Sequence, residues 1–315
     1  MSVCSFSIIR SRAVLDTTWR ENASATGQDP YRYLIWKAPT GLLQNRTCFQ
    51  LLPIVMANLQ RTAKSANDWT PNDLRAYNVT VESLDFLSFF GHHAPNLPAT
   101  DFLTHENLVQ MTNDNDIELM HYAYLATHRV LNEESTVSDF TRDLLKAMGY
   151  TKRDSGTLRT HREIPMYICM ERRSATTDVC LLNAENEITL VVQEHKWHID
   201  DTNEPEPQLI AEAIAAFAYN NFIREVVVGR PIHNQQIIYG IIMNATAPAF
   251  YKIPVSKQLA DAVRRGEYPD SPTKVTTHIP QGPRPSRRSN EGMLKLDNRR
   301  IFIACFEALK ALVLW

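Results

Sequence analysis

The feature that most constrains the fold is a regular order of apolar patterns between residues 135 and 266. Residues 135–149 show helical spacing, with Ser135 or Ser138 able to cap the helix and Gly149 placed to end it. Further segments follow in the order strand, strand, strand, helix, strand, strand, helix. They are residues 164–170, 177–183, 188–196, 208–224, 236–243, 250–255 and 256–266. This order predicts an α/β fold in which helices flank a mixed sheet.

The charge of the chain changes sign near residue 135. Residues 101–139 contain eight acids and one base, whereas residues 142–173 contain eight bases and four acids. Such a reversal is a candidate domain boundary or change of face. We therefore expect a mainly helical N-terminal extension over residues 1–130 and a second domain over residues 131–315. The acidic extension would cover a site or bind a partner.

Several classes of protein lack support in the sequence. The chain has 10 glycines and no glycine-rich phosphate loop or dinucleotide fingerprint, so we expect no organic cofactor. Its five cysteines include no CxxC pair, which argues against a disulfide scaffold and favours an intracellular location, in the cytoplasm or nucleus. The apolar stretch at residues 301–315 is too short to cross a bilayer, so we expect no membrane partner.

Two acids are expected to meet in an antiparallel hairpin. The sequence NAENE at residues 183–187 is a strong turn signal between two β-rich runs. A three-residue loop centred on Asn186 would place Asp178 directly across from Glu194, with Cβ atoms about 4.5–5.5 Å apart. Alternation along the strand puts Lys196 on the same face as Glu194. The pattern predicts two carboxylates and an ammonium group around one hard cation, provided that the register does not slip.

Burial gives these three side chains two interpretations. The runs around Asp178 and Glu194 are apolar on both faces, as expected of strands in the middle of a sheet. Buried charges cost free energy unless they pair with one another or hold a metal. One interpretation of Asp178, Glu194 and Lys196 is therefore a functional site, and the other is a structural ion-pair network within the sheet.

The same residues resemble the motif of the PD-(D/E)XK nuclease superfamily. Thr177 and Asp178 stand where that family has its first metal-binding aspartate. The sequence Glu194-His195-Lys196 matches the family's (D/E)xK element at a compatible separation. The predicted order of helix, three strands, helix and strand is similar to that of the family core. Within this order of elements the short motif becomes moderately specific.

The resemblance extends over most of the chain from about residue 69. Residues 178–219, FYKIPV at 250–255 and LDNRR at 296–300 resemble a broad group of mostly uncharacterised fungal nuclease-like proteins. The resemblance implies a restriction-endonuclease-like core. It also implies metal-dependent hydrolysis of phosphodiester bonds in DNA or RNA.

The resemblance further implies a set of metal ligands. Asp178, Glu194 and the backbone carbonyl of His195 would bind Mg²⁺ or Mn²⁺. Glu133 or Glu134 would stand where many members carry a further acid. Oxygen donors of this kind are the ligands that hard divalent cations prefer.

Two more residues have implied catalytic roles beside Asp178 and Glu194. Lys196 would position the attacking water and help to deprotonate it. Gln208, at the start of the following helix, matches a glutamine that some branches of the family carry. It would orient the water or a phosphate.

A nucleic-acid partner requires local positive charge, because the net charge of −2 gives no whole-protein attraction to a polyanion. Arginines before Asp178 and in the turn-rich segment near residue 290 are expected to clamp backbone phosphates, and an ordinary solvated loop is the alternative. The expected contacts are Arg172, Arg173, Arg284, Arg287, Arg288, Arg299 and Arg300. The sequence leaves a homodimer open.

Two other functions remain open beside a nuclease. A nuclease-like fold that has lost turnover could serve as a nucleic-acid or protein binding module. An interaction protein could instead use the acidic region at residues 101–139 as its working surface. Divalent-ion-dependent cleavage separates the first from a nuclease, and indifference to nucleic acid at low salt would favour the second.

Overall fold

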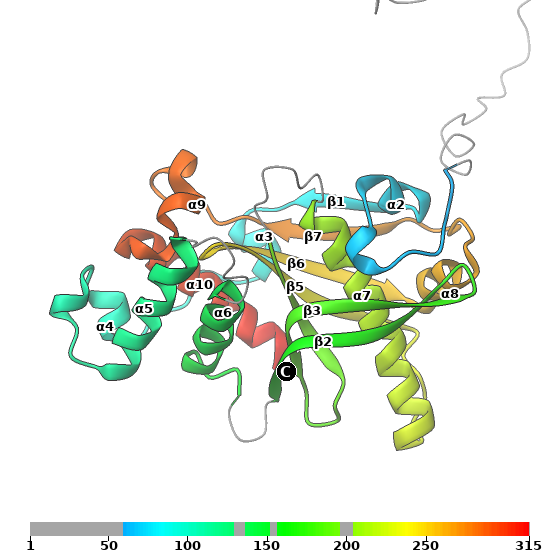
Figure 1. The fold of residues 1–315 in the computed structure, drawn as a ribbon, viewed down its shortest axis with the longest axis horizontal. Helices are drawn as coiled ribbons and strands as arrows, with labels where there is room; N and C mark the ends of the chain where they lie inside the picture. Colours follow the sequence, from blue (N-terminus) through cyan, green and yellow to red (C-terminus); the bar gives the residue numbers. More distant parts are fainter. Residues whose placement is uncertain (1–58, 129–135, 152–155, 196–203, 315) are drawn as a thin grey trace, which may run out of the picture. The chain divides into compact units, whose positions relative to one another are not determined.

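The described chain is organised around one mixed β-sheet (Figure 1). The structure, a computed structural model, describes residues 59–128, 136–151, 156–195 and 204–314. Its strands lie in the order β1-β7-β6-β5-β4-β3-β2, with β4 parallel to β5, β1 parallel to β7 and the other neighbours antiparallel. The strands are β1 (Val79–Ser83), β2 (Thr157–Ile168), β3 (Glu171–Leu182), β4 (Ile188–Glu194), β5 (Gln235–Asn244), β6 (Ala247–Ser256) and β7 (Thr273–His278).

Helices cover both faces of this sheet. Residues of α3, α4, α5, α6 and α10 pack on one face, and residues of η1, α2, α7 and α8 pack on the other. The helices are η1 (Ala66–Asp68), α2 (Pro71–Ala76), α3 (Phe86–Phe90), α4 (Asp101–Thr104), η2 (Leu108–Gln110), α5 (Asp114–Thr127), α6 (Thr136–Ala147), α7 (Pro205–Phe222), the π-helix η3 (Ile223–Val228), α8 (Lys257–Arg265), η4 (Pro285–Arg287), α9 (Arg288–Glu291), η5 (Gly292–Leu294) and α10 (Leu296–Val313). The expected α/β architecture with a mixed sheet and flanking helices is confirmed.

The predicted order of elements after residue 135 is also confirmed. The first helix is α6, the three strands are β2, β3 and β4, and α7, β5, β6 and α8 follow. Local signals fix the ends of α8, where the Ser256 hydroxyl accepts a hydrogen bond from the Leu259 N–H at 3.1 Å. Gly266, with φ of 71°, takes the left-handed conformation that ends the helix.

The strand β2 differs from its prediction. It spans Thr157–Ile168 rather than residues 164–170. Cys169 and Met170 have φ values of 50° and 64° and form the two-residue turn between β2 and β3. Two consecutive left-handed residues match the twist of an antiparallel hairpin, so the apolar run is divided by this turn.

The structure does not divide the chain at residue 131. The strand β1, which precedes that position, pairs in parallel with β7 along Val79–Ser83. Contacts group Gln50–Trp315 as one compact unit, and Met1–Phe49 lies outside the described residues. The change of charge near residue 135 instead falls between α5 and α6, which pack against each other. Residues 59–128 therefore contribute one strand and several short helices to the same unit.

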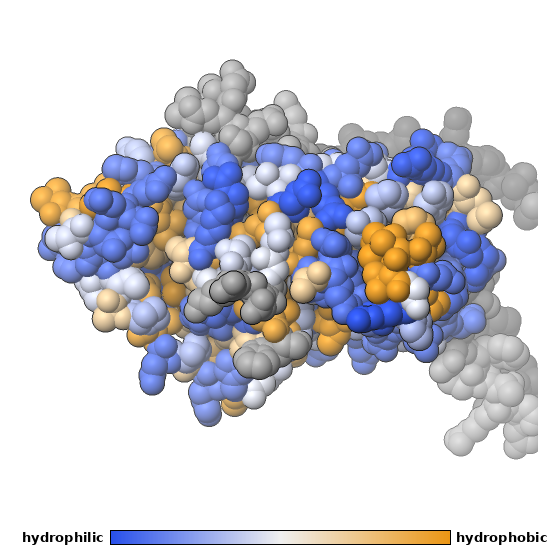
Figure 2. All heavy atoms as spheres, turned by 90° about the horizontal axis from the view of Figure 1, so that it is seen from below, coloured by the Kyte–Doolittle hydropathy of each residue, from blue (hydrophilic) through white to orange (hydrophobic). Residues whose placement is uncertain are grey.

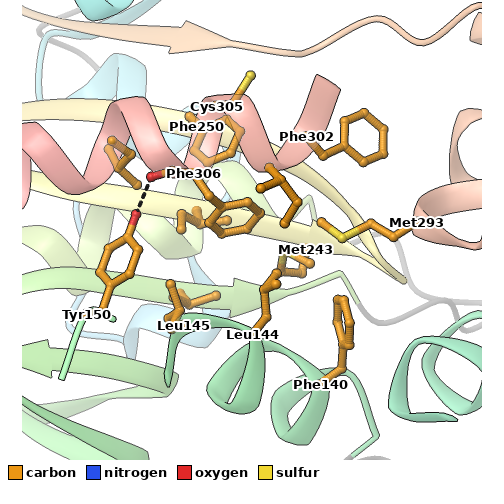
Figure 3. Close-up of a cluster of buried hydrophobic side chains, with 14 of the residues drawn as sticks. Phe140, Leu144, Leu145, Tyr150, Met243, Phe250, Met293, Phe302, Cys305 and Phe306 are labelled. Atoms are coloured by element: carbon orange, nitrogen blue, oxygen red, sulfur yellow. Dashed lines mark hydrogen bonds between the residues drawn. The ribbon is translucent and has the colours of Figure 1, made fainter. Parts of the chain in front are cut away.

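The helix α10 closes one face of the sheet by packing against α6 (Figure 3). Phe140 and Leu144 from α6 belong to the same apolar cluster as Phe302 and Phe306 from α10, and all four side chains are buried. The Tyr150 hydroxyl donates to the backbone carbonyl of Phe306 at 2.7 Å. The apolar stretch near the C-terminus is therefore a helix of the core. None of the described helices has the length and hydropathy needed to cross a bilayer.

An apolar patch interrupts the mainly hydrophilic face seen from below (Figure 2). It lies at the end of α7 and on η3, where Phe222, Val226, Val227 and Val228 are exposed. Gln208 lies 14 residues earlier on α7, which corresponds to about 21 Å of helix. The patch is therefore remote from the predicted site.

Candidate functional site

The hairpin of β3 and β4 carries both predicted metal-binding acids, but its register differs from the prediction. Val179 pairs with Val192, so Asp178 is one residue away from direct opposition to Glu194. The connection is longer than the assumed three residues, since β3 ends at Leu182 and β4 begins at Ile188. A further irregularity lies between Leu181 and Leu182. The expected direct pairing of the two acids is therefore wrong, and strand alternation no longer places the two carboxylates on one face of the sheet.

A hydrogen bond between the Glu194 backbone and the Asp178 side chain nevertheless joins the two residues. The described backbone pairing of β3 with β4 reaches no further toward these acids than Val179 and Val192, and beyond it the Thr177 hydroxyl donates to the Val192 carbonyl at 3.1 Å. The Glu194 N–H then donates to Asp178 Oδ2 at 2.7 Å. Where β3 and β4 separate, the side chains of Thr177 and Asp178 thus take the place of the backbone hydrogen bonds between the two strands. This local opening places the Asp178 carboxylate beside the start of the (D/E)xK sequence.

The two acids differ in their exposure to solvent. Asp178 is half-buried, whereas Glu194 is only 7% exposed. The His195 N–H, which follows Glu194, donates to the Met243 carbonyl at 2.9 Å and continues the parallel pairing with β5. The end of β4 is therefore held from both sides, by Asp178 on β3 and by Met243 on β5.

The helix α7 adds two polar side chains beside Asp178. Gln208, predicted as a site residue, donates through Nε2 to Glu212 Oε1 at 3.2 Å. Glu212 is fully buried, and the charge of Asp178 acts on its carboxyl group. The sequence reasoning missed Glu212, although a residue four positions after Gln208 lies on the same helix face.

Burial raises the pKa of Glu212 well above its usual value of 4.5, and the negative charge of Asp178 raises this pKa further. The folded protein therefore keeps a proton on Glu212 at pH values where the unfolded chain has released it. The unfolding free energy contributed by this group is highest below about pH 4.5 and falls as the pH rises. The fall is at most about 1.4 kcal/mol per pH unit, until the folded carboxyl also ionises.

Glu212→Gln is expected to remove this pH dependence. Glutamine keeps an oxygen acceptor for Gln208 but cannot ionise, so the variant should gain stability relative to the parent as the pH rises from 5 to 7. Urea denaturation of both proteins at several pH values measures the difference. Parallel stability profiles for the two proteins would show that Glu212 does not hold a proton in the folded state.

The donors near Asp178 suit a hard divalent cation by their chemistry. Asp178 and Glu194 supply carboxylate oxygens, which Mg²⁺ and Mn²⁺ prefer. Within the described ranges, no three His, Cys, Asp or Glu side chains converge as a metal-ligand group. Three predicted residues lie outside the described residues, namely Lys196, Glu133 and Glu134.

Two of the arginines predicted to contact phosphates, Arg288 and Arg299, are the most buried of the set and bind the protein's own backbone. Arg299 is fully buried and donates to the carbonyls of Phe102 and Glu106 at 2.7 and 2.9 Å. Burial lowers the pKa of Arg299 to about 10. Arg288 donates to the carbonyl of Pro280 at 2.9 Å and to that of Pro248. These guanidinium groups hold the protein's own backbone, so the prediction that Arg299 contacts phosphate is wrong.

The other predicted arginines are exposed, and most of them have partners in the protein. Arg300 donates to the Leu103 carbonyl at 3.0 Å, and Arg284 and Arg287 form ion pairs with Glu291 at 3.0 and 3.6 Å. The remaining pair, Arg172 and Arg173, lies at the start of β3; Arg173 contacts Glu171 at 2.7 Å. Arg172 is six residues from Asp178, or about 20 Å along an extended strand. Arg172 and Arg173 therefore lie away from Asp178 along β3, and contact of the exposed arginines with nucleic acid remains a prediction.

The acidic region at residues 101–139 lines a separate cavity of about 940 Å³ between α4, α5 and α6. Its acids are largely engaged within the chain. The Asp101 carboxylate accepts from the Thr112 and Asn113 N–H groups at 2.6 and 2.9 Å, and these bonds lower the pKa of Asp101. Asp143 accepts from Arg142 and Lys146. These contacts give the acids a structural role.

Comparison with known proteins adds no relative. Neither a scan against protein-family models nor a search of curated proteins finds a match to the chain. The residues around Asp178 and the order of the elements that carry them are therefore the basis for assigning a function.

Proposed function

We propose that this protein is a divalent-metal-dependent nuclease with a PD-(D/E)XK, restriction-endonuclease-like core. The order α6, β2, β3, β4, α7, β5 supports the proposal, because it is the order of elements on which the resemblance depends. The substrate would be DNA or RNA. The reaction would be hydrolysis of a phosphodiester bond.

A single hydrogen bond carries the proposal. The Glu194 N–H donates to Asp178 Oδ2 at 2.7 Å, which joins the two acids of the motif from neighbouring strands. Glu194 and Glu212 are buried, and a buried carboxyl group costs free energy in a fold that does not use it. Glu212 adds a third carboxyl group near Asp178, and its pKa is raised by burial and by the charge of Asp178. The free-energy cost supports a site rather than a structural motif.

Different residues of the chain would bind the metal ion, the attacking water and the substrate. Asp178, Glu194 and the His195 carbonyl would hold Mg²⁺ or Mn²⁺, and the ion supplies charge stabilisation at the phosphate and the leaving oxygen. Lys196, which lies outside the described residues, would hold the attacking water and accept or share its proton. Gln208 would hold that water in place. The exposed arginines would contact backbone phosphates further along the substrate.

A binding module without turnover is the second candidate. The described residues contain no three-residue group of His, Cys, Asp or Glu side chains suited to a metal, and this observation favours it. The intramolecular contacts of Arg288 and Arg299 also reduce the positive surface available for a nucleic acid. Such a module would bind without cutting.

Metal-dependent cleavage tests the proposed function. We expect the full-length protein to cut an end-labelled DNA or RNA oligonucleotide with Mg²⁺ or Mn²⁺, to stop in excess EDTA, and to resume when the ion is restored. Double-stranded DNA, single-stranded DNA and RNA of one sequence should be compared. Cleavage that continues in EDTA, or no cleavage of any substrate, contradicts the proposal; binding without cleavage at low salt would support the module.

A further inference from the structure

Asn67 and Glu212 hold the side-chain amide of Gln208 between them. Gln208 Nε2 donates to Asn67 Oδ1 at 3.3 Å and to Glu212 Oε1 at 3.2 Å. An amide nitrogen has two hydrogens, so both donors of Gln208 are used within the protein. None of the described residues donates a hydrogen bond to the side-chain oxygen Oε1 of Gln208. This oxygen is the polar atom of the side chain left for a ligand.

The position of Asn67 is fixed by its neighbours. Asn67 is exposed and lies in η1, but Ala66 and Trp69 on either side of it are fully buried in the core beneath α7. The η1 backbone is therefore anchored while the Asn67 side chain faces Gln208. This contact joins a segment near residue 67 to the site, across a separation of 141 residues.

Burial of the Glu212 carboxyl group costs free energy, and core packing does not require this group. Its side chain is fully buried, and no hydrogen bond of ordinary geometry from the described residues reaches Oε2. The Thr177 hydroxyl, which donates to the carbonyls of Val179 and Val192, is a nearby donor that acts on this carboxyl group. An unsatisfied buried polar group costs about 1–3 kcal/mol in proteins. A glutamine of the same shape could still accept from Gln208 without an ionisable group. The carboxyl group is therefore better explained by the site than by core packing.

The Gln208 amide nitrogen faces two oxygen atoms. With Asn67 and Glu212 both in place, Gln208 directs its nitrogen to the protein and keeps its oxygen for a ligand. An amide oxygen accepts a hydrogen bond from water or ligates a hard cation, and it cannot donate to a phosphate. Loss of either partner leaves the amide free to turn.

We infer that Asn67 and Glu212 are positioning residues that make Gln208 an acceptor for a hydrated divalent cation rather than a donor to the substrate phosphate. The inference rests on the proposed function and deepens it. It assigns the segment around η1 to the site, although the charge pattern places that segment in a separate extension. It also narrows the role of Gln208 to the water and the ion.

Asn67 variants of the full-length protein test the inference, because this side chain is exposed and its replacement leaves the core intact. Asn67→Ala removes the acceptor, and we expect kcat for Mn²⁺-dependent oligonucleotide cleavage to fall about tenfold with KM unchanged, as for outer partners of metal sites. In the absence of substrate, we expect the affinity of the protein for Mn²⁺, measured by isothermal titration calorimetry, to fall about tenfold as well. Asn67→Asp keeps an oxygen acceptor and is expected to retain kcat within about threefold of the parent. A purely structural Asn67 would not show this difference.

A double-mutant cycle with Gln208→Ala separates action through Gln208 from independent effects. We expect Gln208→Ala to lower kcat about 10–100-fold and Asn67→Ala to have no further effect in that background. Parent-like cleavage by Asn67→Ala, or losses that multiply in the double variant, overturns the inference while the nuclease stands. Absence of Mn²⁺-dependent cleavage by the parent itself overturns the proposed function, and the inference falls with it.

Discussion

Asp178→Asn is expected to lower metal-dependent cleavage at least about 100-fold. A bound metal ion contributes several kcal/mol of transition-state stabilisation, and each 1.4 kcal/mol changes a rate about tenfold. Asparagine has the shape of aspartate and keeps an oxygen that can accept from the Glu194 N–H, so the junction of β3 and β4 should persist. Initial rates at saturating Mg²⁺ measure the loss.

Two controls make the Asp178→Asn result specific. The thermal midpoint of the variant should stay within a few degrees of the parent, because the hydrogen bond at 2.7 Å can be retained. Asp101→Asn removes an acid in the cavity between α4, α5 and α6, far from Asp178 in the sequence. This variant should leave cleavage unchanged. An Asp178→Asn variant that folds and cuts at the parental rate would remove Asp178 from the site.

Phe306→Ala is expected to lower the unfolding free energy by about 3–5 kcal/mol. Phe306 is fully buried between α10 and the sheet, and its ring meets that of Phe250 edge-to-face with centroids 5.1 Å apart. Truncation leaves a cavity in the cluster around α6 and α10 (Figure 3), where close packing limits collapse. Urea denaturation followed by circular dichroism measures the change.

Phe306→Leu is the matched control for this cavity. Leucine keeps most of the apolar volume and leaves the backbone carbonyl that accepts from Tyr150 unchanged, so we expect a clearly smaller loss than with alanine. Equal losses for alanine and leucine would point to the aromatic contact with Phe250 rather than to volume. A loss below about 1 kcal/mol for alanine would contradict the packing of α10 on the sheet.

Local chemistry explains which parts of the fold could be predicted. The Ser256 cap and Gly266 fixed α8, and the apolar spacing of α6 and α7 fixed the helices that flank β2, β3 and β4. These signals act within one or two turns of helix, so they are visible in the sequence. The α/β class and the order of its central elements followed from them.

Long-range pairing explains what could not be predicted. The strands β1 and β7 are short, and their parallel pairing joins segments almost 200 residues apart in the chain. The register of β3 and β4 depended on the loop at residues 183–187 and on the irregularity at Leu181. No pattern in the sequence determines either feature, because side-chain alternation fixes the face of a strand but not its partner.

The candidate site also combines residues with a local sequence signal and residues whose contacts are long-range. Asp178, Glu194 and Gln208 could be proposed as site residues because they match a short motif with a fixed place among the elements. Glu212 had a usable signal, its spacing of four from Gln208, whereas Asn67 had none, because its contact spans 141 residues. Burial made the prediction for Arg299 fail, since a run of arginines does not reveal that one of them faces the core.

Anomalous diffraction from a crystal of the full-length protein grown with Mn²⁺ tests the central claim most directly. The account predicts a Mn²⁺ peak between the carboxylates of Asp178 and Glu194, with oxygen ligands at about 2.0–2.3 Å. A Mn²⁺ peak elsewhere, or an ordered pair of carboxylates turned away from each other at millimolar Mn²⁺, would contradict it.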